Sequence, residues 1–280
     1  MPVLSINDQW ASAQVGHHAD YSVKNVQTYT NETSDLFIVQ VEMKNLESRF
    51  VNHSKLSAFI KDSQNTLYPA TVAETSSKII PQGKGLVTIS ALMPKGSPKT
   101  GMQLLIGQSV KGNQLATLDE TPDAYFHVTG FELPDREQEP QDTLKKIDMF
   151  PYTLSLSNFS TSVNMITEEL TLSFHTELGK DLLTQTSTAG HRLIIEITDE
   201  QSDVTTSESI DLEAAASDIS ETGGKFIKLG KGKYEMENHD SDFIEHVNYS
   251  GKFRLKLYDE YLGHKRLITS KPVSWFASLE

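Results

Sequence analysis

Residues 38–45 read Ile-Val-Gln-Val-Glu-Met-Lys-Asn, and they open the stretch, residues 38–95, that decides the fold. Two more runs follow, Lys-Asp-Ser-Gln-Asn-Thr-Leu-Tyr-Pro-Ala at residues 61–70 and Ile-Ile-Pro-Gln-Gly-Lys-Gly-Leu-Val-Thr-Ile-Ser-Ala-Leu-Met-Pro-Lys at residues 79–95. Alternating apolar and polar residues are typical of half-buried strands, whereas Pro, Gly, Asn and Asp between such runs are typical of turns. The stretch therefore predicts a small β-sandwich.

Strand-like runs of this kind recur along the first half of the chain, at spacings of roughly ten to fifteen residues. They cover residues 21–29, 36–44, 56–60, 66–72, 86–92, 102–107 and 124–133. No long amphipathic helical pattern separates them, which disfavours a βαβ fold. Short strands joined by turn residues predict an all-β sandwich instead.

The turns within the deciding stretch have residues suited to them. Residues 62–65, Asp-Ser-Gln-Asn, tolerate left-handed backbone geometry and predict a hairpin, in which Asp62 bonds to its own loop backbone. Asn45 suits a turn directly after a strand. Gly83 or Gly85 is expected to take a positive φ at a corner, because glycine has no side chain to clash there.

Length and composition predict two domains. A chain of 280 residues exceeds the size at which one hydrophobic core is usual. Residues 134–142, Pro-Asp-Arg-Glu-Gln-Glu-Pro-Gln-Asp, have the polar, proline-bounded composition of a linker. We expect a first immunoglobulin-like β-sandwich at residues 1–134, a linker at 135–148 and a second β-sandwich at 149–280. Strand-like runs in the second half cover residues 170–174, 191–197, 253–258, 266–269 and 273–276.

Residues 209–219 leave two alternatives open. Their sequence, Ser-Ile-Asp-Leu-Glu-Ala-Ala-Ala-Ser-Asp-Ile, contains good helix formers and predicts a short helix that crosses between sheets. A strand at residues 210–212 is the alternative. Propensity alone does not decide between them.

The first domain resembles a group of extracytoplasmic immunoglobulin-like domains of Gram-positive bacteria that includes the family labelled DUF4352. The matching pattern lies within residues 20–130: a strand that ends in Asn45, a strand that leads into Asp62, the aromatic Tyr68, a Pro-x-Gly turn at residues 81–83 and a strand that closes at Pro94. The resemblance implies a location in the cell envelope, often as part of a lipoprotein, and a non-catalytic role.

Composition excludes several classes of function. The formal charge of −13 and scattered basic residues disfavour nucleic-acid binding, which needs clustered Lys and Arg. The chain has no cysteine, so disulfides, thiolate metal sites and cysteine nucleophiles are excluded. No run approaches the roughly 20 apolar residues of a membrane span. We expect an extracellular or cell-surface protein, anchored through a segment absent from this chain, with a cytosolic scaffold as the alternative.

An acidic stretch at residues 235–245 offers oxygen ligands of the kind that calcium prefers. The candidate ligands are Glu237, Asn238, Asp240 and Asp242. The stretch lacks the spacing and the central glycine of an EF-hand loop. A calcium site and a solvated acidic loop both remain open, and calcium is the one cofactor that the sequence suggests.

Aromatic residues near the C-terminus form a candidate ligand site. Tyr258, Tyr261 and Trp275 could stack on a sugar, whereas aromatic rings in strands also serve as core or cross-strand pairs. The sequence has no Gly-x-Ser-x-Gly elbow, no His-Glu-x-x-His and no phosphate loop. We therefore expect a non-catalytic binding or structural module with a protein or cell-wall partner. A secreted glycan-binding accessory protein or hydrolase that uses these aromatics and acidic loops is the alternative.

Overall fold

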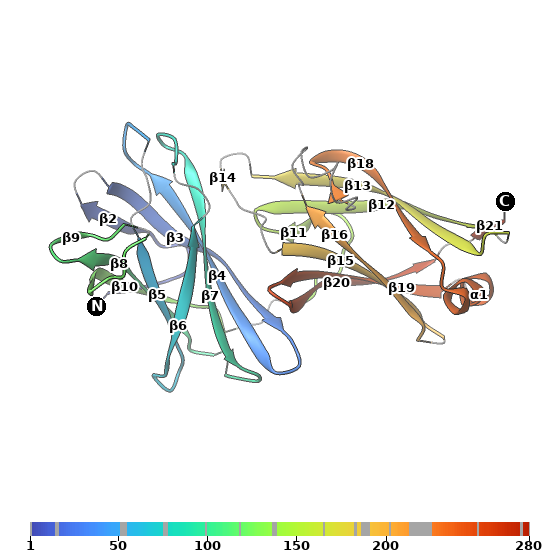
Figure 1. Cartoon of the computed structure of the whole chain (residues 1–280), viewed down its shortest axis with the longest axis horizontal. Helices are drawn as coiled ribbons and strands as arrows, with labels where there is room; N and C mark the ends of the chain where they lie inside the picture. Colours follow the sequence, from blue (N-terminus) through green and yellow to red (C-terminus); the bar gives the residue numbers. More distant parts are fainter. Residues whose placement is uncertain are drawn as a thin grey trace. The chain divides into compact units, whose positions relative to one another are not determined.

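Strands dominate the structure, which confirms the predicted all-β class (Figure 1). The structure is a computed structural model that describes residues 2–14, 17–50, 55–74, 78–98, 100–117, 119–135, 139–164, 166–181, 184–185, 191–201, 203–212, 226–250, 252–274 and 277–279. The chain divides into two compact units. Unit 1 is Met1–Gln138 with Leu182–Ser187, and unit 2 is Glu139–Asp181 with Thr188–Glu280.

Unit 1 is a two-sheet sandwich in which a strand overlaps each of the runs predicted for the first half. Its strands are β1 (Val3–Leu4), β2 (Trp10–Gln14), β3 (His17–Thr30), β4 (Ser34–Asn45), β5 (Leu56–Lys61), β6 (Leu67–Glu74), β7 (Lys84–Pro94), β8 (Gln103–Lys111), β9 (Gln114–Leu115), β10 (Ala124–Glu132) and β14 (Thr184–Gln185). One sheet has the order β2-β3-β4-β7, with β14 also paired to β7. The other has the order β5-β8-β10-β1, with β9 paired to β8.

Strand β6 belongs to both sheets of unit 1 and lies between β5 and β7 (Figure 1). Its residues 67–70 pair with β5, and this ladder ends at Ala58 and Ala70. Its residues 71–74 pair with β7 instead. Strands that switch sheets in this way make the corners of a sandwich. The switch opens a fork between β5 and β6.

The core of unit 1 lies between its sheets, because alternate residues of each strand point inward. Strand β5 shows this alternation over its full length, with Leu56, Ala58 and Ile60 buried and the residues between them half-buried. Fully buried members from six strands are Val23, Val39, Ile60, Ile89, Ile106 and Phe131. Burying a side chain of this size contributes about 1.5–3 kcal/mol.

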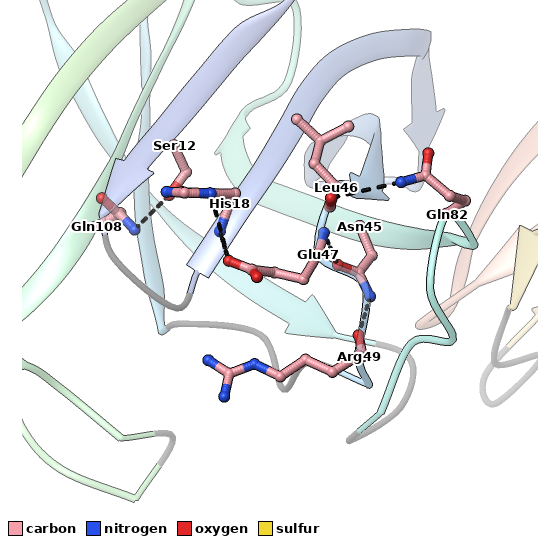
Figure 2. A network of polar contacts seen from close by, with 8 residues as sticks. All are labelled: Ser12, His18, Asn45, Leu46, Glu47, Arg49, Gln82 and Gln108. Atoms are coloured by element: carbon pink, nitrogen blue, oxygen red, sulfur yellow. Dashed lines mark hydrogen bonds and ion pairs between the residues drawn. The ribbon is translucent and has the colours of Figure 1, made fainter.

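Asn45 holds the corner at the end of β4 (Figure 2). Its Nδ2 group donates to the carbonyl oxygens of Arg49 at 2.9 Å, Ile79 at 3.1 Å and Ile80 at 3.1 Å. Its Oδ1 accepts from the Glu47 amide at 2.8 Å. The predicted turn role of Asn45 is confirmed, and the side chain is fully buried.

The next corner differs from the prediction. Gln82 takes the positive φ, 61°, and neither Gly83 nor Gly85 does. Gly83 is required for space instead, because a Cβ there would lie 2.5 Å from the Ile80 Cγ1 atom. The hairpin predicted at residues 62–65 is confirmed, with Asn65 at φ 67° and the Asp62 carboxylate accepting from loop amides.

Unit 2 is also a two-sheet sandwich. Its elements are β11 (Ile147–Met149), β12 (Tyr152–Asn164), β13 (Glu169–Lys180), β15 (His191–Asp199), β16 (Thr205–Leu212), β17 (Phe226–Ile227), β18 (Gly230–Asn238), α1 (Ser241–Ser250), β19 (Lys252–Tyr261), β20 (His264–Ser274) and β21 (Ala277–Leu279). One sheet has the order β11-β12-β13-β18, with β21 on β12, and the other has the order β17-β16-β15-β19-β20. The core between them includes Phe174, Ile195 and Leu255.

Both units have the same order of main strands, which confirms the prediction of two tandem immunoglobulin-like sandwiches. Among the described residues, seven strands of each unit correspond: β3, β4, β5, β6, β7, β8 and β10 to β12, β13, β15, β16, β18, β19 and β20. In each, the first, second and fifth strands form one sheet, and the fourth, third, sixth and seventh form the other. This is a Greek-key sandwich arrangement.

Two parts of unit 2 bear on the predicted boundaries. Residues 139–148 were expected to be linker, but the Gln141 amide donates to the Ile268 carbonyl at 2.7 Å and β11 pairs with β12. These contacts tie that segment to unit 2. Strand β16 takes the strand alternative at residues 210–212, while residues 213–219 lie outside the described residues. The described residues include no helix long and apolar enough to cross a membrane.

Candidate functional site

A groove of about 520 Å³ opens where β5 and β6 separate in unit 1. We call it the fork groove. Lys55 and residues of β5 line one side, residues of β6 line the other, and the segment around the start of β10 contributes the rest. The side chains used below are Lys55, Ser57, Phe59, Pro69, Val72, Pro122 and Tyr125. Its volume lies within the range of ligand sites in proteins.

The backbone explains why the groove lies at this position. The Asp62 amide donates to the Thr66 carbonyl at 3.0 Å, and the β5–β6 ladder continues from this hairpin as far as Ala58. Backbone groups of alternate residues face the same neighbouring strand. Leu56 is therefore the next residue of β5 that faces the β6 side, and it lies beyond the end of that ladder and lines the groove.

Aromatic side chains form the outer wall of the groove. The rings of Phe59 and Tyr125 lie edge to face, with centroids 5.9 Å apart and an interplanar angle of 73°. Phe59 lies opposite Pro69 in the β5–β6 ladder, so both are on the outer face of the sheet. Tyr125 is 51% exposed, although it is large and apolar. Exposed aromatic groups in a concave surface are typical of binding sites.

A β-bulge in β10 orients the aromatic residues beside the groove. The register of β10 with β8 shifts between Phe126 and Thr129, and His127 in the bulge has φ 54°. Gly107 of β8 makes this packing possible, because a Cβ there would lie 2.9 Å from the Val128 Cγ2 atom. Bulges commonly redirect side chains next to functional sites.

Lys55 gives the groove its charge. Among the described residues that line the groove, Lys55 is charged and none is acidic. Its Nζ donates to the backbone carbonyl of Glu120. The Glu120 carboxylate accepts from the Thr117 amide at 2.8 Å and from the Thr117 hydroxyl at 3.0 Å. These bonds, with a smaller effect of nearby lysine charge, lower the pKa of Glu120.

One of the four residues predicted to bind calcium, Asp240, caps a helix in the structure. The Asp240 carboxylate accepts from the amides of Asp242 at 3.0 Å and Phe243 at 3.2 Å, which makes it the N-cap of α1. Asn238 Oδ1 accepts from the Asp240 amide at 2.6 Å, and Glu237 is exposed in β18. The predicted acidic loop is therefore a strand end followed by a capped helix. The described part of the chain holds no group of three or more His, Asp or Glu side chains that could bind a metal ion.

The structure does not bring Tyr258 and Tyr261, two residues of the predicted aromatic site, together on one face. Tyr258 and Tyr261 are three positions apart in β19, so they point to opposite faces of the sheet. The Tyr258 hydroxyl donates to the Glu196 carboxylate at 3.4 Å, and burial, followed by the charge of Glu196, raises the pKa of Tyr258. Trp275 lies outside the described residues.

Sequence reasoning missed the fork groove and its side chains Phe59 and Tyr125. One signal was present, because Pro69 lies inside the predicted strand at residues 66–72. Proline cannot donate to a ladder, and it is confined to edges and irregular positions in sheets. It therefore marks a strand whose pairing changes.

A scan against protein-family models finds no match, so the resemblance to DUF4352 has no support from a family model. A search of curated proteins finds no match either. Among solved structures, the chain is similar to an uncharacterized beta-sandwich protein from Clostridium difficile 630, at 11% identity with a TM-score of 0.32, over 48% of this chain and 94% of that chain. It is also similar to the FN1-FN3 domains of chicken CNTN1, at 10% identity with a TM-score of 0.25, over 92% of this chain and 66% of that chain. These similarities concern the fold alone.

Proposed function

We propose that the chain is a non-catalytic binding module of the cell envelope, and that the fork groove is its binding site. The observation that carries the proposal is the combination of a concave surface of about 520 Å³ with the exposed aromatic ring of Tyr125. Apolar and aromatic walls with a few polar groups are the usual composition of ligand sites.

The location in the envelope rests on the sequence. The resemblance of residues 20–130 to DUF4352-like domains of Gram-positive bacteria supports an extracellular or cell-surface site, and the absence of cysteine agrees with it. The partner would be a protein or a cell-wall component. A lipoprotein anchor fits the same resemblance.

The proposal is tested by co-sedimentation of the purified chain with envelope fragments of a Gram-positive bacterium. We expect the wild type to sediment with the fragments and Tyr125→Ala to lose most of this binding. Leu92→Ala is the matched control, because Leu92 is an exposed apolar residue of unit 1 outside the groove, with 61% exposure. Equal sedimentation of Tyr125→Ala and the wild type would contradict the proposed site.

A catalytic role is tested in the same experiment. We expect no release of sugars or peptides from the fragments over background. Release by the wild type would overturn the non-catalytic assignment and favour a secreted hydrolase. Binding that survives Tyr125→Ala but is lost in Tyr258→Ala would favour the alternative of a glycan-binding accessory protein.

A further inference from the structure

We infer that the fork groove binds an extended peptide, apolar with an acidic residue near one end, which adds to β5 as a strand beside Leu56. This inference rests on the proposed function and names the partner class of the same site. Three features of the groove support it: the interrupted ladder, the apolar walls on both sides of the fork, and the charge of Lys55.

The interrupted ladder supplies the backbone contact. Strand β6 leaves β5 after Ala70 and continues along β7, so the Leu56 position of β5 lies beside the groove instead of beside β6. An extended peptide that enters the fork meets β5 in the place where β6 would otherwise continue. Addition of a strand to a sheet edge is a common mode of peptide recognition, in which main-chain hydrogen bonds provide affinity.

The two walls of the fork define the side chains of the peptide. Alternate residues of a strand point to opposite faces of its sheet. On the outer face the peptide would meet Phe59 and Tyr125, whereas on the inner face it would meet Val72, a partly buried residue that packs against the core of unit 1. Apolar surface on both faces selects a continuous apolar run over an alternating one.

Charge determines the acidic residue. Lys55 precedes β5 and is the charged member of the groove lining, although the chain as a whole carries a formal charge of −13. A cationic position in an otherwise acidic protein is complementary to an anionic ligand group. A peptide with Asp or Glu near the Lys55 end of the groove satisfies this complementarity.

The polar groups of the groove favour a peptide over a glycan. Recognition of a sugar requires side chains that bind its hydroxyl groups in addition to an aromatic ring. The hydroxyl of Ser57 already bonds to that of Ser109 at 2.7 Å. The peptide instead uses the backbone of β5, which needs no polar side chain.

The test is a selection of random twelve-residue peptides displayed on phage, carried out in parallel on the full-length wild type and on Tyr125→Ala. We expect the wild type to enrich peptides that contain an apolar run and an acidic residue. The same peptides, made synthetically, should bind Tyr125→Ala at least tenfold more weakly. Leu92→Ala is expected to bind them as the wild type does. Thermal unfolding of each variant controls for folding, and Phe59→Ala provides a second variant of the same wall.

Two modified peptides test the mode of binding. Methylation of a single backbone nitrogen, scanned along the selected peptide, is expected to weaken binding about tenfold at one position, because the amide there loses its hydrogen bond to the Leu56 carbonyl beyond the end of the β5–β6 ladder. Lys55→Glu is expected to weaken binding of the acidic peptide and to strengthen binding of its Asp→Lys counterpart, and both effects should diminish in high salt.

The failures of this inference and of the proposed function are distinguishable. Absence of any peptide enriched on the wild type over Tyr125→Ala, or an N-methyl scan without effect at every position, would overturn the peptide inference. Groove-dependent binding to protein-free glycan strands, together with either result, would leave the proposed function intact and make the ligand a glycan. Loss of groove-dependent envelope binding as well would overturn both.

Discussion

The two units share a strand order, but their fourth strands are paired differently. In unit 2, β16 remains beside β15 along a continuous ladder from Leu193–Ile210 to Thr198–Thr205. In unit 1, β6 divides its length between β5 and β7. The same topology therefore gives an uninterrupted ladder between the third and fourth strands in unit 2, and in unit 1 a fourth strand that leaves the third partway along. The difference shows that the groove arises from strand pairing and needs no insertion.

The outer faces of the corresponding sheets differ as well. In unit 2, Lys256 bonds to Glu196 at 2.8 Å on this face, and Tyr258 contacts the same carboxylate. The equivalent face of unit 1 carries the aromatic pair Phe59 and Tyr125. A charged face stays solvated, whereas an exposed apolar patch indicates an interaction site. This contrast places the expected binding activity in unit 1.

Core substitutions should have the largest effect, and each should destabilise the unit that carries it. Phe131→Ala in unit 1 and Phe174→Ala in unit 2 each remove a fully buried ring, so each should lower the free energy of unfolding of its own unit by about 3–5 kcal/mol. Hydrogen exchange resolved by residue should show the loss of protection in the mutated unit. Phe126→Ala, at a 55% exposed position, is the control and should change stability little. Equal loss of protection in both units would mean that they unfold as one.

Removal of the side-chain hydrogen bonds of Asn45 should have the next largest effect on the free energy of unfolding. Asn45→Ala removes the side-chain donor from the Ile79 carbonyl in a buried contact, which should cost about 1–3 kcal/mol, whereas the Ile80 carbonyl keeps its bond from the Gly83 amide. Urea unfolding followed by fluorescence measures this cost. Asn113→Ala, at an exposed turn position, is the matched control. A cost no larger than that of the control would show that the corner is held by other contacts.

The N-cap of helix α1 in unit 2 should contribute less to the free energy of unfolding than the Asn45 corner does. Asp240→Ala removes the acceptor for the amides of Asp242 and Phe243 and should cost about 1 kcal/mol, whereas Asp240→Asn should retain most of the stability. Urea unfolding with and without calcium also tests the predicted metal site. A calcium-dependent stabilisation of the wild type that Asp240→Asn loses would favour calcium binding over a purely structural cap.

The smallest expected effect concerns the hairpin that precedes the fork. Burial raises the pKa of Asp62, but hydrogen bonds from Thr66, Gln64 and Tyr68 outweigh it and lower this pKa below its usual value. The ionised carboxylate therefore stabilises the folded state above about pH 4, and this contribution is lost as the pH falls through the folded pKa. The difference in urea midpoint between the wild type and Asp62→Asn should shrink below about pH 4. A difference in urea midpoint that does not change with pH would contradict the lowered pKa of Asp62.

Much of the fold could be predicted because its signals are local. Alternation at residues 38–45 and 86–92 predicts strands, since a sandwich strand buries every second side chain. The hairpin at residues 62–65 follows from residues that tolerate left-handed geometry. Helix α1 escaped prediction because it is short, and its Phe243 and Ile244 are buried against the core of unit 2. Tertiary packing stabilises such helices more than propensity does.

The candidate site was less predictable than the strands that carry it. The separation of Tyr258 and Tyr261 could have been read from their spacing, because residues three apart in a strand face opposite sides. The contact between Phe59 and Tyr125 could not, because the 65 residues between them carry no local signal for it. To predict the N-cap role of Asp240, it would have been necessary to know that a helix follows it.

The sequence by itself determined the positions of most main strands of unit 1, the turn at residues 62–65, and the class of two tandem all-β sandwiches. These properties depend on side-chain alternation and on the local backbone preferences of Asn, Asp, Gly and Pro. Only the tertiary structure decided that β6 divides between two sheets and opens the fork groove beside Leu56. A strand's hydrogen-bonding partner is set by which distant segment lies next to it, and that choice depends on packing across the whole sandwich.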